Sequence, residues 1–382
     1  MDRGLYLSTI ALLFISLLSV YSLSIYPTIY FGTSEYFFFK KQLYSVIISI
    51  LILTIISKMN PYRVFKPLGF TIFIGSFIAF AVMLLLPENM VKAVLGAKRW
   101  ISFGFFSFAP VEFFKYGFIF FISWSLARKY NALYNTKSFT QEVLVLLPYF
   151  FILFVAVAFI AVAQKDLGQV VVITISLLAL ILLAGGSKKL FFSLFSMAIV
   201  LFITLILVAP HRLHRFKGWW VGIQEIFKPI LPNSFIVTDT AVPYHIINSL
   251  KAIEGGGLFG RGIGEGQYKL GFLSEVHTDF IISGLSEEIG FLGISLIFIL
   301  YFYILYRIFN IGSKLKKLED KFFVYGVAIV IFISGMINMY GISGLIPIKG
   351  IAIPLLSYGG SQIIATSLAI SMVLMLSRKV EK

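Results

Sequence analysis

Residues 143–186 read VLVLLPYFFILFVAVAFIAVAQKDLGQVVVITISLLALILLAGG, and two of them, Lys165 and Asp166, are charged. A helix needs about 20 mainly apolar residues to cross the hydrocarbon core of a bilayer. Two such runs, 143–163 and 167–186, flank the short polar turn QKD. The stretch therefore predicts two transmembrane helices joined at one surface of a membrane.

The same apolar pattern recurs along the chain. Of its 382 residues, 59% are hydrophobic and 13% are charged, whereas a soluble domain is about half apolar and about a quarter charged. A water-soluble core could not bury this excess, so much of it must face lipid. We predict an all-α membrane protein, a bundle of about ten transmembrane helices that forms one unit over residues 1–382. The predicted spans lie near residues 4–25, 42–57, 67–86, 107–127, 143–163, 167–186, 190–209, 289–306, 322–342 and 357–377.

The distribution of Lys and Arg predicts the orientation of the bundle. With an uncleaved first span and a cytoplasmic N-terminus, the cytoplasmic segments hold 17 Lys and Arg and the short outer loops hold 7. This is the bias expected of membrane proteins, so we predict a multi-pass protein of the cytoplasmic (inner) membrane with both termini inside. The net charge of +15 fits cations beside anionic lipid better than a nucleic-acid surface. The absence of cysteine excludes disulfides and thiolate chemistry.

The segment between the seventh and eighth predicted spans, residues 210–288, is too polar to span and too long for a plain connection. Aromatic and apolar residues recur in it, which argues against disorder. Residues 246–253 have helical spacing and are followed by the glycines 255–257. We predict amphipathic helices on the outer leaflet and interpret residues 210–288 as an extracytoplasmic catalytic loop.

Residues 96–101 read GAKRWI, in the loop after the third predicted span. Arg99 can chelate phosphate oxygens bidentately, and Trp100 can anchor at the depth of the lipid headgroups. With Lys98 they suit a phosphate-bearing lipid. The alternative interpretation is an ordinary interfacial anchor, a role in which such residues are common.

Two further places hold ionisable groups near the outer ends of predicted spans. Glu112 and Lys115 lie three residues apart, so they can pair on one face of the fourth span. Ionisable groups within a span are costly and often mark function, but a structural ion pair is the alternative. Asp166 is either a site carboxylate at the mouth of the bundle or the N-cap of the sixth span.

A glycine-rich run, GGGLFGRGIG, occupies residues 255–264 and is followed by Lys269 and then by SEVHTDF at 274–280. Glycines at this density let a backbone approach a ligand closely and offer N–H groups to anions. Asp279 precedes apolar residues, and apolar surroundings raise the pKa of a carboxyl group, so Asp279 is the candidate general base. Helix capping is the alternative for Asp279, and an interfacial position is the alternative for His277.

Near the end of the chain, PIKG at 347–350 and PLLSYGGS at 354–361 bracket a segment rich in proline and glycine. Such backbone is tolerated at membrane depth only where protein or water covers its freed polar groups. We predict a broken or re-entrant beginning of the last span that faces the same outer cavity. Lys349 and Ser357 are its candidate substrate-binding residues.

These motifs, in this order, resemble the SEDS family (shape, elongation, division and sporulation), and the resemblance covers nearly the whole chain. GAKRW and residues 347–350 are more similar to the division members than to the elongation members. Three places depart from the family pattern: Ser274-Glu275, residues 109–112 and Tyr244-His245. The most specific matching parts are residues 96–101, Glu112 with Lys115, and residues 165–168, 277–281, 287–290 and 357–361.

The resemblance implies a ten-helix peptidoglycan glycosyltransferase that polymerises lipid II outside the membrane, with Asp279 as its essential acid. It also implies a class B penicillin-binding protein as partner, within the division or elongation machinery. In that role Asp279 would deprotonate the acceptor sugar hydroxyl, while Lys98 and Arg99 would bind the donor's pyrophosphate. The other substrate-binding candidates are Trp100, Glu112, Lys115, Asp166, Lys269, His277, Lys349 and Ser357. A divalent cation, Mg²⁺ or Mn²⁺, could assist, although the sequence shows no dedicated metal cage.

Two other functions stay open. As a lipid II flippase, the chain would move its substrate past Glu112 and Lys115. Against this, the later helices carry no deep charge and the sequence shows no inverted repeat of the kind usual in transporters. As a scaffold, the chain would only recruit a penicillin-binding protein.

Overall fold

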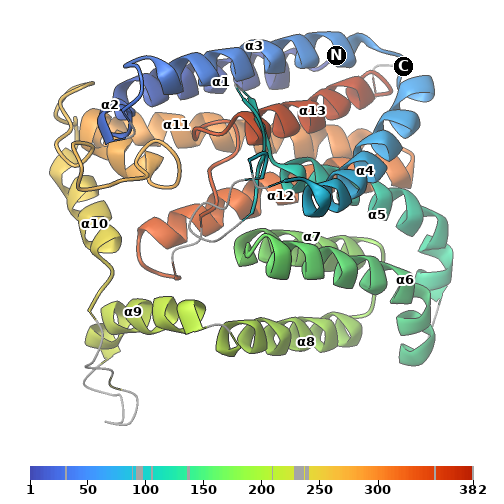
Figure 1. Cartoon of the computed structure of the whole chain (residues 1–382). Helices are drawn as coiled ribbons and strands as arrows, with labels where there is room; N and C mark the ends of the chain where they lie inside the picture. The colour runs from blue at the N-terminus through green and yellow to red at the C-terminus, as the bar shows by residue number, and fades with distance from the viewer. Residues whose placement is uncertain are drawn as a thin grey trace.

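The computed structural model describes residues 1–30, 32–87, 89–91, 98–104, 106–135, 138–208, 210–227, 236, 241–347 and 350–380. Within these ranges the regular structure is helical apart from one two-stranded antiparallel sheet (Figure 1). The elements are α1 (Arg3–Leu23), α2 (Ile25–Tyr30), α3 (Phe37–Lys58), α4 (Pro61–Leu85), β1 (Ile101–Phe103), β2 (Phe106–Phe108), α5 (Pro110–Asn135), α6 (Phe139–Val157), the π-helix η1 (Ala158–Ala163), α7 (Leu167–Leu183), α8 (Lys188–Leu207), α9 (Pro210–Phe227), α10 (Tyr244–Gly256), α11 (Ile281–Lys314), α12 (Leu318–Ile342) and α13 (Gly360–Ser377).

Each of the ten predicted spans overlaps one long helix, with α6 and η1 together forming the fifth. Eight of the helices in the described part of the chain are long and apolar enough to cross a membrane. The other two are α7, which is apolar but has 17 residues, and α5, in which Glu112 and Lys115 reduce the apolar content. The chain is a multi-pass α-helical membrane protein, and the full count of ten spans stays a prediction.

The beginning of the eighth span differs from the prediction. The sequence predicts a span over 289–306 after a loop that reaches residue 288, but α11 begins at Ile281 and ends at Lys314. Gly290 interrupts this helix with φ 65° and ψ −172°, a backbone conformation that is essentially restricted to glycine. The turns before the break contain Glu287 and Glu288, whose charge made them look like loop. They are buried instead, because Arg261 pairs with Glu287 at 3.3 Å and Lys269 pairs with Glu288 at 2.6 Å.

Several short elements were not predicted from the sequence. Helix α2 has six residues and each strand has three, which is too short for hydrophobic periodicity to be visible. The strands pair Ile101 with Phe108, so they hold the end of the GAKRWI motif against the beginning of α5. The helices predicted within 210–288 are present as α9 and α10, and α10 ends at the predicted glycines.

Helix α13 forms the centre of the bundle and α8 its periphery. In α13, 89% of the apolar window is buried inside the protein, whereas in α8 the share is 17%. The small side chains of α13, among them Ser361, Ala365 and Ala369, let neighbouring backbones approach closely. Helix α13 packs most extensively on α3 and also contacts α5 and α12. The central helices therefore form a rigid frame, while α8 mainly faces its surroundings.

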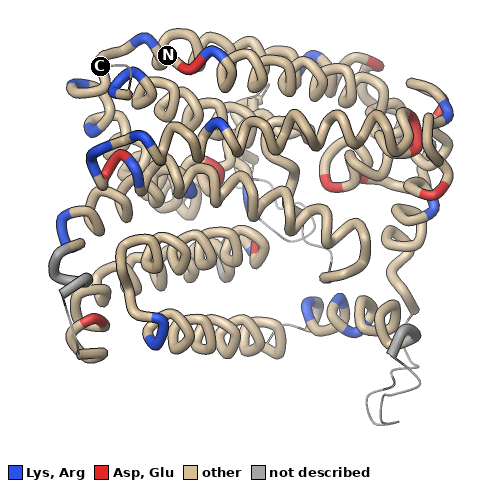
Figure 2. The backbone as a smooth tube through the Cα atoms, turned by 180° about the vertical axis from the view of Figure 1, so that it is seen from behind, with Lys and Arg blue, Asp and Glu red and all other residues tan. Residues whose placement is uncertain are grey.

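Both chain ends lie at one end of the bundle, and α2, α9 and α10 lie at the other (Figure 1). Lys and Arg gather at the end that carries the termini (Figure 2). There Arg307 pairs with Asp2 at 2.6 Å, and Lys379 pairs with Asp320 at 2.6 Å. These pairs fasten the first and last segments of the chain to α11 and α12.

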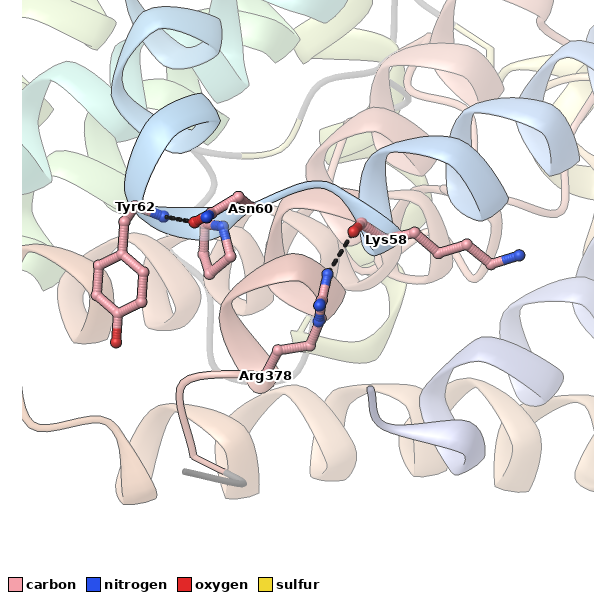
Figure 3. A pocket seen from close by; sticks show the side chains of 5 residues that line it. Lys58, Asn60, Tyr62 and Arg378 are labelled. Atoms are coloured by element: carbon pink, nitrogen blue, oxygen red, sulfur yellow. Dashed lines mark hydrogen bonds between the residues drawn. The ribbon is translucent and has the colours of Figure 1, made fainter.

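A cavity of about 150 Å³ lies at this same end, between α3, α4 and the end of α13 (Figure 3). Arg378 donates to the carbonyl oxygens of Lys58 and Met59, which end α3. Asn60 caps α4 by accepting from the Tyr62 amide at 2.9 Å. The Lys58 ammonium points away from the cavity in Figure 3. The cavity is therefore a corner of the fold in which Arg378 satisfies helix-end carbonyls.

Candidate active site

Asp279 lies in the turns that lead into α11, at the end of the bundle opposite the termini. Its backbone carbonyl accepts from the Asn338 side-chain amide of α12 at 2.7 Å, and the same amide donates to the carbonyl of Ile351 at 2.8 Å. Asn338 thus fixes the backbone of Asp279 beside the irregular segment that precedes α13. The predicted broken beginning of the last span is present: residues 350–359 are non-helical, and Ile351, Leu355 and Ser357 are fully buried.

The Asp279 carboxyl group and the Arg99 guanidinium both face Gly350. A Cβ atom at Gly350 would lie 3.1 Å from Asp279 Oδ2 and 3.7 Å from Arg99 Nη1. The first of these distances is tighter than ordinary van der Waals contact, so a side chain here would crowd the carboxyl group. Glycine at this position therefore leaves room for the acid and the cation to share one space.

Arg99 joins the GAKRWI motif to the turn between η1 and α7. Its Nε lies 3.4 Å from Asp166 Oδ2, and its guanidinium donates to the carbonyls of Gln164 and Lys165 at 3.4 and 3.3 Å. Asp166 also caps α7, because its Oδ1 accepts from the Gln169 amide at 3.3 Å. Asp166 is thus both a helix cap and a member of the cluster around Arg99.

A strongly basic pocket opens beside this cluster. Cations from three separate segments line it, and the other lining residues are Asp166, Leu167, Gly168, Ile206, Phe216, Pro347 and Gly350. Part of the hydrogen-bonding capacity of Arg212 is already used, since it donates to the carbonyls of Leu205 and Ala161 at 2.8 and 2.7 Å. These bonds hold the beginning of α9 against the ends of α8 and η1. The lining cations are Arg99, Lys165, Arg212 and Arg215.

The Asp279 carboxyl group has a raised pKa of about 7. Burial is the largest cause, because removing a carboxylate from water disfavours its charged form. The nearby carboxylates of Glu275 and Asp166 raise the pKa further, whereas Arg99 and Arg215 lower it. Asp279 is partly accessible rather than sealed, so it combines a near-neutral pKa with access to a ligand.

The FtsW/RodA/SpoVE family, described as cell cycle protein, matches residues 3–382. The chain belongs to this family. It is 40% identical to a probable peptidoglycan glycosyltransferase FtsW of Helicobacter pylori over 383 residues, covering 99% of this chain and 98% of that one. It is 32% identical to the protein of the same name from Haemophilus influenzae, covering 98% and 89% of the two chains.

Two solved structures share the fold. A chain from work entitled "Structural coordination of polymerization and crosslinking by a peptidoglycan synthase complex" superposes with a TM-score of 0.73 at 21% identity, covering 100% of this chain and 98% of that one. The rod shape determining protein RodA of Thermus thermophilus superposes with a TM-score of 0.65 at 21% identity, with the same coverage. At this identity the likeness concerns the fold. The remaining predicted residues therefore lie in a fold that this chain shares with both structures.

Glu112 and Lys115 form a buried pair on α5 rather than a wall of the basic pocket. Lys115 Nζ lies 2.8 Å from Glu112 Oε2, and the Gln169 side-chain amide donates to Glu112 Oε1 at 2.8 Å. Glu112 is 8% exposed and Lys115 is 2% exposed. In this member of the FtsW/RodA/SpoVE family, the pair joins α5 to α7 directly behind Asp166, which agrees with the structural interpretation.

Lys269 is also buried in a pair and does not face the basic pocket. Its Nζ lies 2.6 Å from Glu288 Oε1, both side chains are 1% exposed, and Ser22 of α1 donates to both oxygens of Glu288. Glu287 beside it accepts from the amides of Gln267 and Tyr268 at 2.8 and 3.0 Å. These contacts fix the glycine-rich loop to α1 and α11, so Lys269 positions this loop rather than a ligand.

His277 and Ser357 also occupy structural positions. Burial lowers the pKa of His277 to about 4, so the ring is neutral near pH 7. It packs against Phe38 and Tyr358, with ring centroids 4.8 and 5.2 Å apart. Its carbonyl accepts from the Tyr358 amide at 2.9 Å, while Ser357 Oγ accepts from the Ile353 amide at 2.9 Å. Both residues therefore hold the broken segment beside Asp279.

The remaining predicted residues are Lys98, Trp100 and Lys349. Lys98 is exposed and Trp100 is 38% exposed, so both lie at the surface beside Arg99. Lys349 lies outside the described residues. Among the residues that the structure describes, no group of three or more His, Asp or Glu is arranged to hold a metal ion.

Sequence reasoning missed three residues that shape the site: Arg215, Glu275 and Asn338. Arg215 belongs to a basic run, HRLHR at 211–215, that a search for cations near the membrane surface could have flagged. Glu275 was visible within the run SEVHTDF and at a departure from the family pattern, but nothing in the sequence marked it as a neighbour of the Asp279 carboxyl group. Asn338 had no signal, because a single polar residue inside an apolar span shows no partner until the fold supplies one.

Proposed function

We propose that the chain is a peptidoglycan glycosyltransferase that polymerises lipid II. The relatives in two bacteria carry the name probable peptidoglycan glycosyltransferase FtsW, and one structural neighbour comes from work on a peptidoglycan synthase complex. The observation that carries the proposal is a carboxyl group with a pKa of about 7 placed beside a pocket lined by cations. A base and an anion site in one place are what transfer from a diphosphate donor requires.

In the proposed reaction, a hydroxyl oxygen of the acceptor sugar attacks the anomeric carbon of the donor sugar. Asp279 takes the hydroxyl proton as the new carbon–oxygen bond forms. The bond from the anomeric carbon to the donor's pyrophosphate breaks, and the electron pair leaves with the pyrophosphate. A carboxyl group whose pKa lies near the working pH is about half ionised at that pH. Its ionised form is then available to accept the proton and is still basic enough to do so.

The cations of the basic pocket would bind the pyrophosphate. Arg99 and Arg215 both lie close enough to influence the pKa of Asp279, so an anion bound between them would be near the base. Guanidinium groups bind phosphate oxygens bidentately and stabilise the negative charge that grows on the leaving group. From the surface beside Arg99, Lys98 would add a further cation and Trp100 an interfacial anchor.

A Mg²⁺ or Mn²⁺ ion fits the site only as a companion of the substrate. Octahedral coordination needs about six oxygen ligands, whereas among the described residues the basic pocket is lined by one carboxylate, Asp166, with Asp279 and Glu275 nearby. Asp166 is already paired with Arg99. A divalent cation would therefore be held chiefly by pyrophosphate oxygens, with one of these carboxylates contributing at most a ligand, and it would supply further charge neutralisation.

The same proposal places the site outside the cytoplasmic membrane and both termini inside. Lys and Arg gather at the end of the bundle that carries the termini (Figure 2), as the positive-inside rule requires of cytoplasmic ends. Because the chain lacks cysteine, single cysteines can report sidedness. In intact spheroplasts an impermeant thiol reagent should label Glu265→Cys and spare Lys316→Cys, and the opposite pattern would invert the topology.

We also include a class B penicillin-binding protein as partner, in a division or elongation complex. The support is the structural neighbour taken from a peptidoglycan synthase complex. Affinity purification of the tagged chain from its native membranes should recover a single-span penicillin-binding protein in stoichiometric amounts. Full polymerisation by the isolated chain would show that the partner is not needed for catalysis.

The deciding experiment is polymerisation of lipid II by the purified chain. Asp279→Asn keeps the size of the side chain but cannot take the proton, so the rate should fall by roughly 10²–10⁴-fold, the usual worth of a positioned base. Glu265→Gln removes an exposed carboxylate from the glycine-rich loop and serves as the matched control with an unchanged rate. Near-normal polymerisation by Asp279→Asn would remove Asp279 from the chemistry.

The flippase interpretation predicts a different result in the same variants. Moving a headgroup across the membrane requires no proton acceptor at Asp279, so transport by a flippase should survive Asp279→Asn. The buried pair of Glu112 and Lys115 would then be the sensitive place. Lipid II transport into proteoliposomes, measured beside polymerisation, distinguishes the two functions.

A further inference from the structure

The break in α11 at Gly290 is filled by the glycine-rich loop. The amides of Phe291 and Leu292 donate to the carbonyls of Gly257 and Leu258 at 2.9 and 3.1 Å. In the other direction, the amides of residues 261 and 262 donate to the carbonyls of residues 287 and 288, both at 2.9 Å. The loop thus supplies partners for the amides of residues 291 and 292 and for the carbonyls of residues 287 and 288, which lie on either side of the break.

Close approach of two backbones makes this junction possible. A Cβ atom at Gly290 would lie 2.3 Å from the Gly260 nitrogen, and one at Gly260 would lie 2.2 Å from the Glu288 carbonyl oxygen. No side chain fits either position. Figure 1 shows the loop folded against this end of α11, next to α2. The tip of the loop is therefore held at a fixed depth relative to α11.

The tip carries three exposed apolar side chains, and the cation between them, Arg261, is held by Glu287 at 3.3 Å. Leu258 is 62% exposed, Phe259 is 79% exposed and Ile263 is 77% exposed. On α11, Leu292, Leu296 and Ile299 form a row of exposed apolar side chains, which is what a lipid-facing helix surface shows. Since the Leu292 amide donates a hydrogen bond to the Leu258 carbonyl, the exposed apolar side chains of the tip continue the lipid-facing row of α11.

The length of α11 places the junction within the membrane. Arg307 pairs with Asp2 at the beginning of the chain, so its charged group marks the membrane surface at the end that carries the termini. Phe291 is 16 residues earlier in the helix, which corresponds to about 24 Å at 1.5 Å per residue. The hydrocarbon core is about 30 Å thick. Phe291, Leu292 and the loop bonded to them therefore fall short of the opposite surface.

We propose that Leu258, Phe259 and Ile263 form a membrane anchor. Their side chains insert among the phospholipid acyl chains of the outer leaflet. The inference rests on the chain being a multi-pass membrane protein and not on the proposed activity. Irregular backbone is tolerated at this depth because the break in α11 and the loop satisfy each other's polar groups. The anchor fixes the position, relative to the membrane, of the segment that leads through Lys269 to Asp279.

The test uses single cysteines in a chain that has none. Phe259→Cys carries an environment-sensitive NBD fluorophore in nanodiscs of phosphatidylcholine and phosphatidylglycerol. Leu296→Cys, on the exposed face of α11, is the lipid-exposed control, and Glu265→Cys, an exposed charged position of the same loop, is the water-exposed control. Because all three side chains are exposed, none of the substitutions removes a buried contact, and thermal melting confirms the fold.

Doxyl groups on the lipid acyl chains should quench the probe at 259 as strongly as the probe at 296, and several-fold more than the probe at 265. Aqueous iodide should quench the probe at 265 and spare the probe at 259. Quenching of position 259 by iodide but not by doxyl lipid would overturn the proposal. A probe at 259 shielded from both reagents would also overturn it, because a protein surface would then cover the tip.

Discussion

Asp279 and Glu288 lie nine residues apart, but their side chains have opposite surroundings. Glu288 is sealed from water, and Lys269 at 2.6 Å and the Ser22 hydroxyl satisfy it. Asp279 is partly accessible, and the nearest influences on it are of mixed sign, with burial dominant, so its pKa rises to about 7. The carboxylate of Glu288 is paired, whereas among the residues that the structure describes no cation forms an ion pair with Asp279.

This difference separates positioning from chemistry within one stretch of chain. The charge of a fully paired buried carboxylate is satisfied by its partners, and removing its cation leaves an uncompensated charge in the protein interior. A carboxyl group that is desolvated but unpaired is poised to take a proton. Variants of the two regions should therefore fail in different ways, one in stability and the other in rate or binding.

The largest effect on stability is expected from Lys269→Met. The substitution leaves the Glu288 carboxylate buried without its cation, which should lower the free energy of unfolding by about 3–5 kcal/mol. The double variant Lys269→Met, Glu288→Leu removes both charges and should recover most of this loss. Denaturation in detergent measures both values. Equal destabilisation by the single and the double variant would show that packing, not charge, is at stake.

The next effect is expected from the basic pocket. Arg215→Ala removes a cation near Asp279 and should raise the KM for lipid II by about 10- to 100-fold, the worth of one charge-assisted hydrogen bond. The free energy of unfolding should change little. The double variant Lys98→Ala, Arg99→Ala should lose still more affinity. Normal steady-state kinetics in the double variant would favour the interfacial-anchor interpretation of residues 96–101.

A smaller effect should appear in the pH dependence of the rate. With a base whose pKa is about 7, kcat/KM should rise as pH increases and level off above pH 7. Glu275→Gln removes a negative charge that raises the pKa of Asp279, so the acidic limb of the profile should move to lower pH. Gln can still accept from Thr278, which preserves the local turn. An unmoved limb would mean that another group titrates.

The smallest effect concerns stability against pH. The pKa of Asp279 is about 7 in the folded protein, against an ordinary value of 3.8 that applies to the unfolded chain, so the folded state binds the proton more tightly between these values. The contribution of Asp279 to the free energy of unfolding therefore falls as pH rises through this window. Asp279→Asn should melt above the wild type at pH 8 and close to it near pH 4. A variant that melts lower at pH 8 would give Asp279 a structural role.

Much of the site could be anticipated from residue types, but its boundaries could not. Arg99, Asp166 and Asp279 were all predicted, and the structure brings them to one place around Gly350. Lys115, a charge within a predicted span, and Lys269, which follows the glycine-rich run, were also candidate substrate-binding residues. The structure pairs each with a carboxylate, as the spacing of Glu112 and Lys115 predicted for that pair. A charge near a membrane signals that it needs a partner, and the sequence does not say whether the partner is a ligand or another side chain.

The sequence by itself determined the membrane class, the approximate positions of the spans and the family. Apolar runs of the length of a bilayer leave a chain few choices, because every backbone polar group within lipid must be satisfied inside its own helix. The tertiary structure alone decided which charges pair, where α11 breaks and which segments surround Asp279. These features depend on contacts between residues far apart in the chain, such as Asn338 with Asp279 and Ser22 with Glu288. No local sequence pattern encodes such contacts, since the two partners are distant in the sequence and come together only in the folded chain.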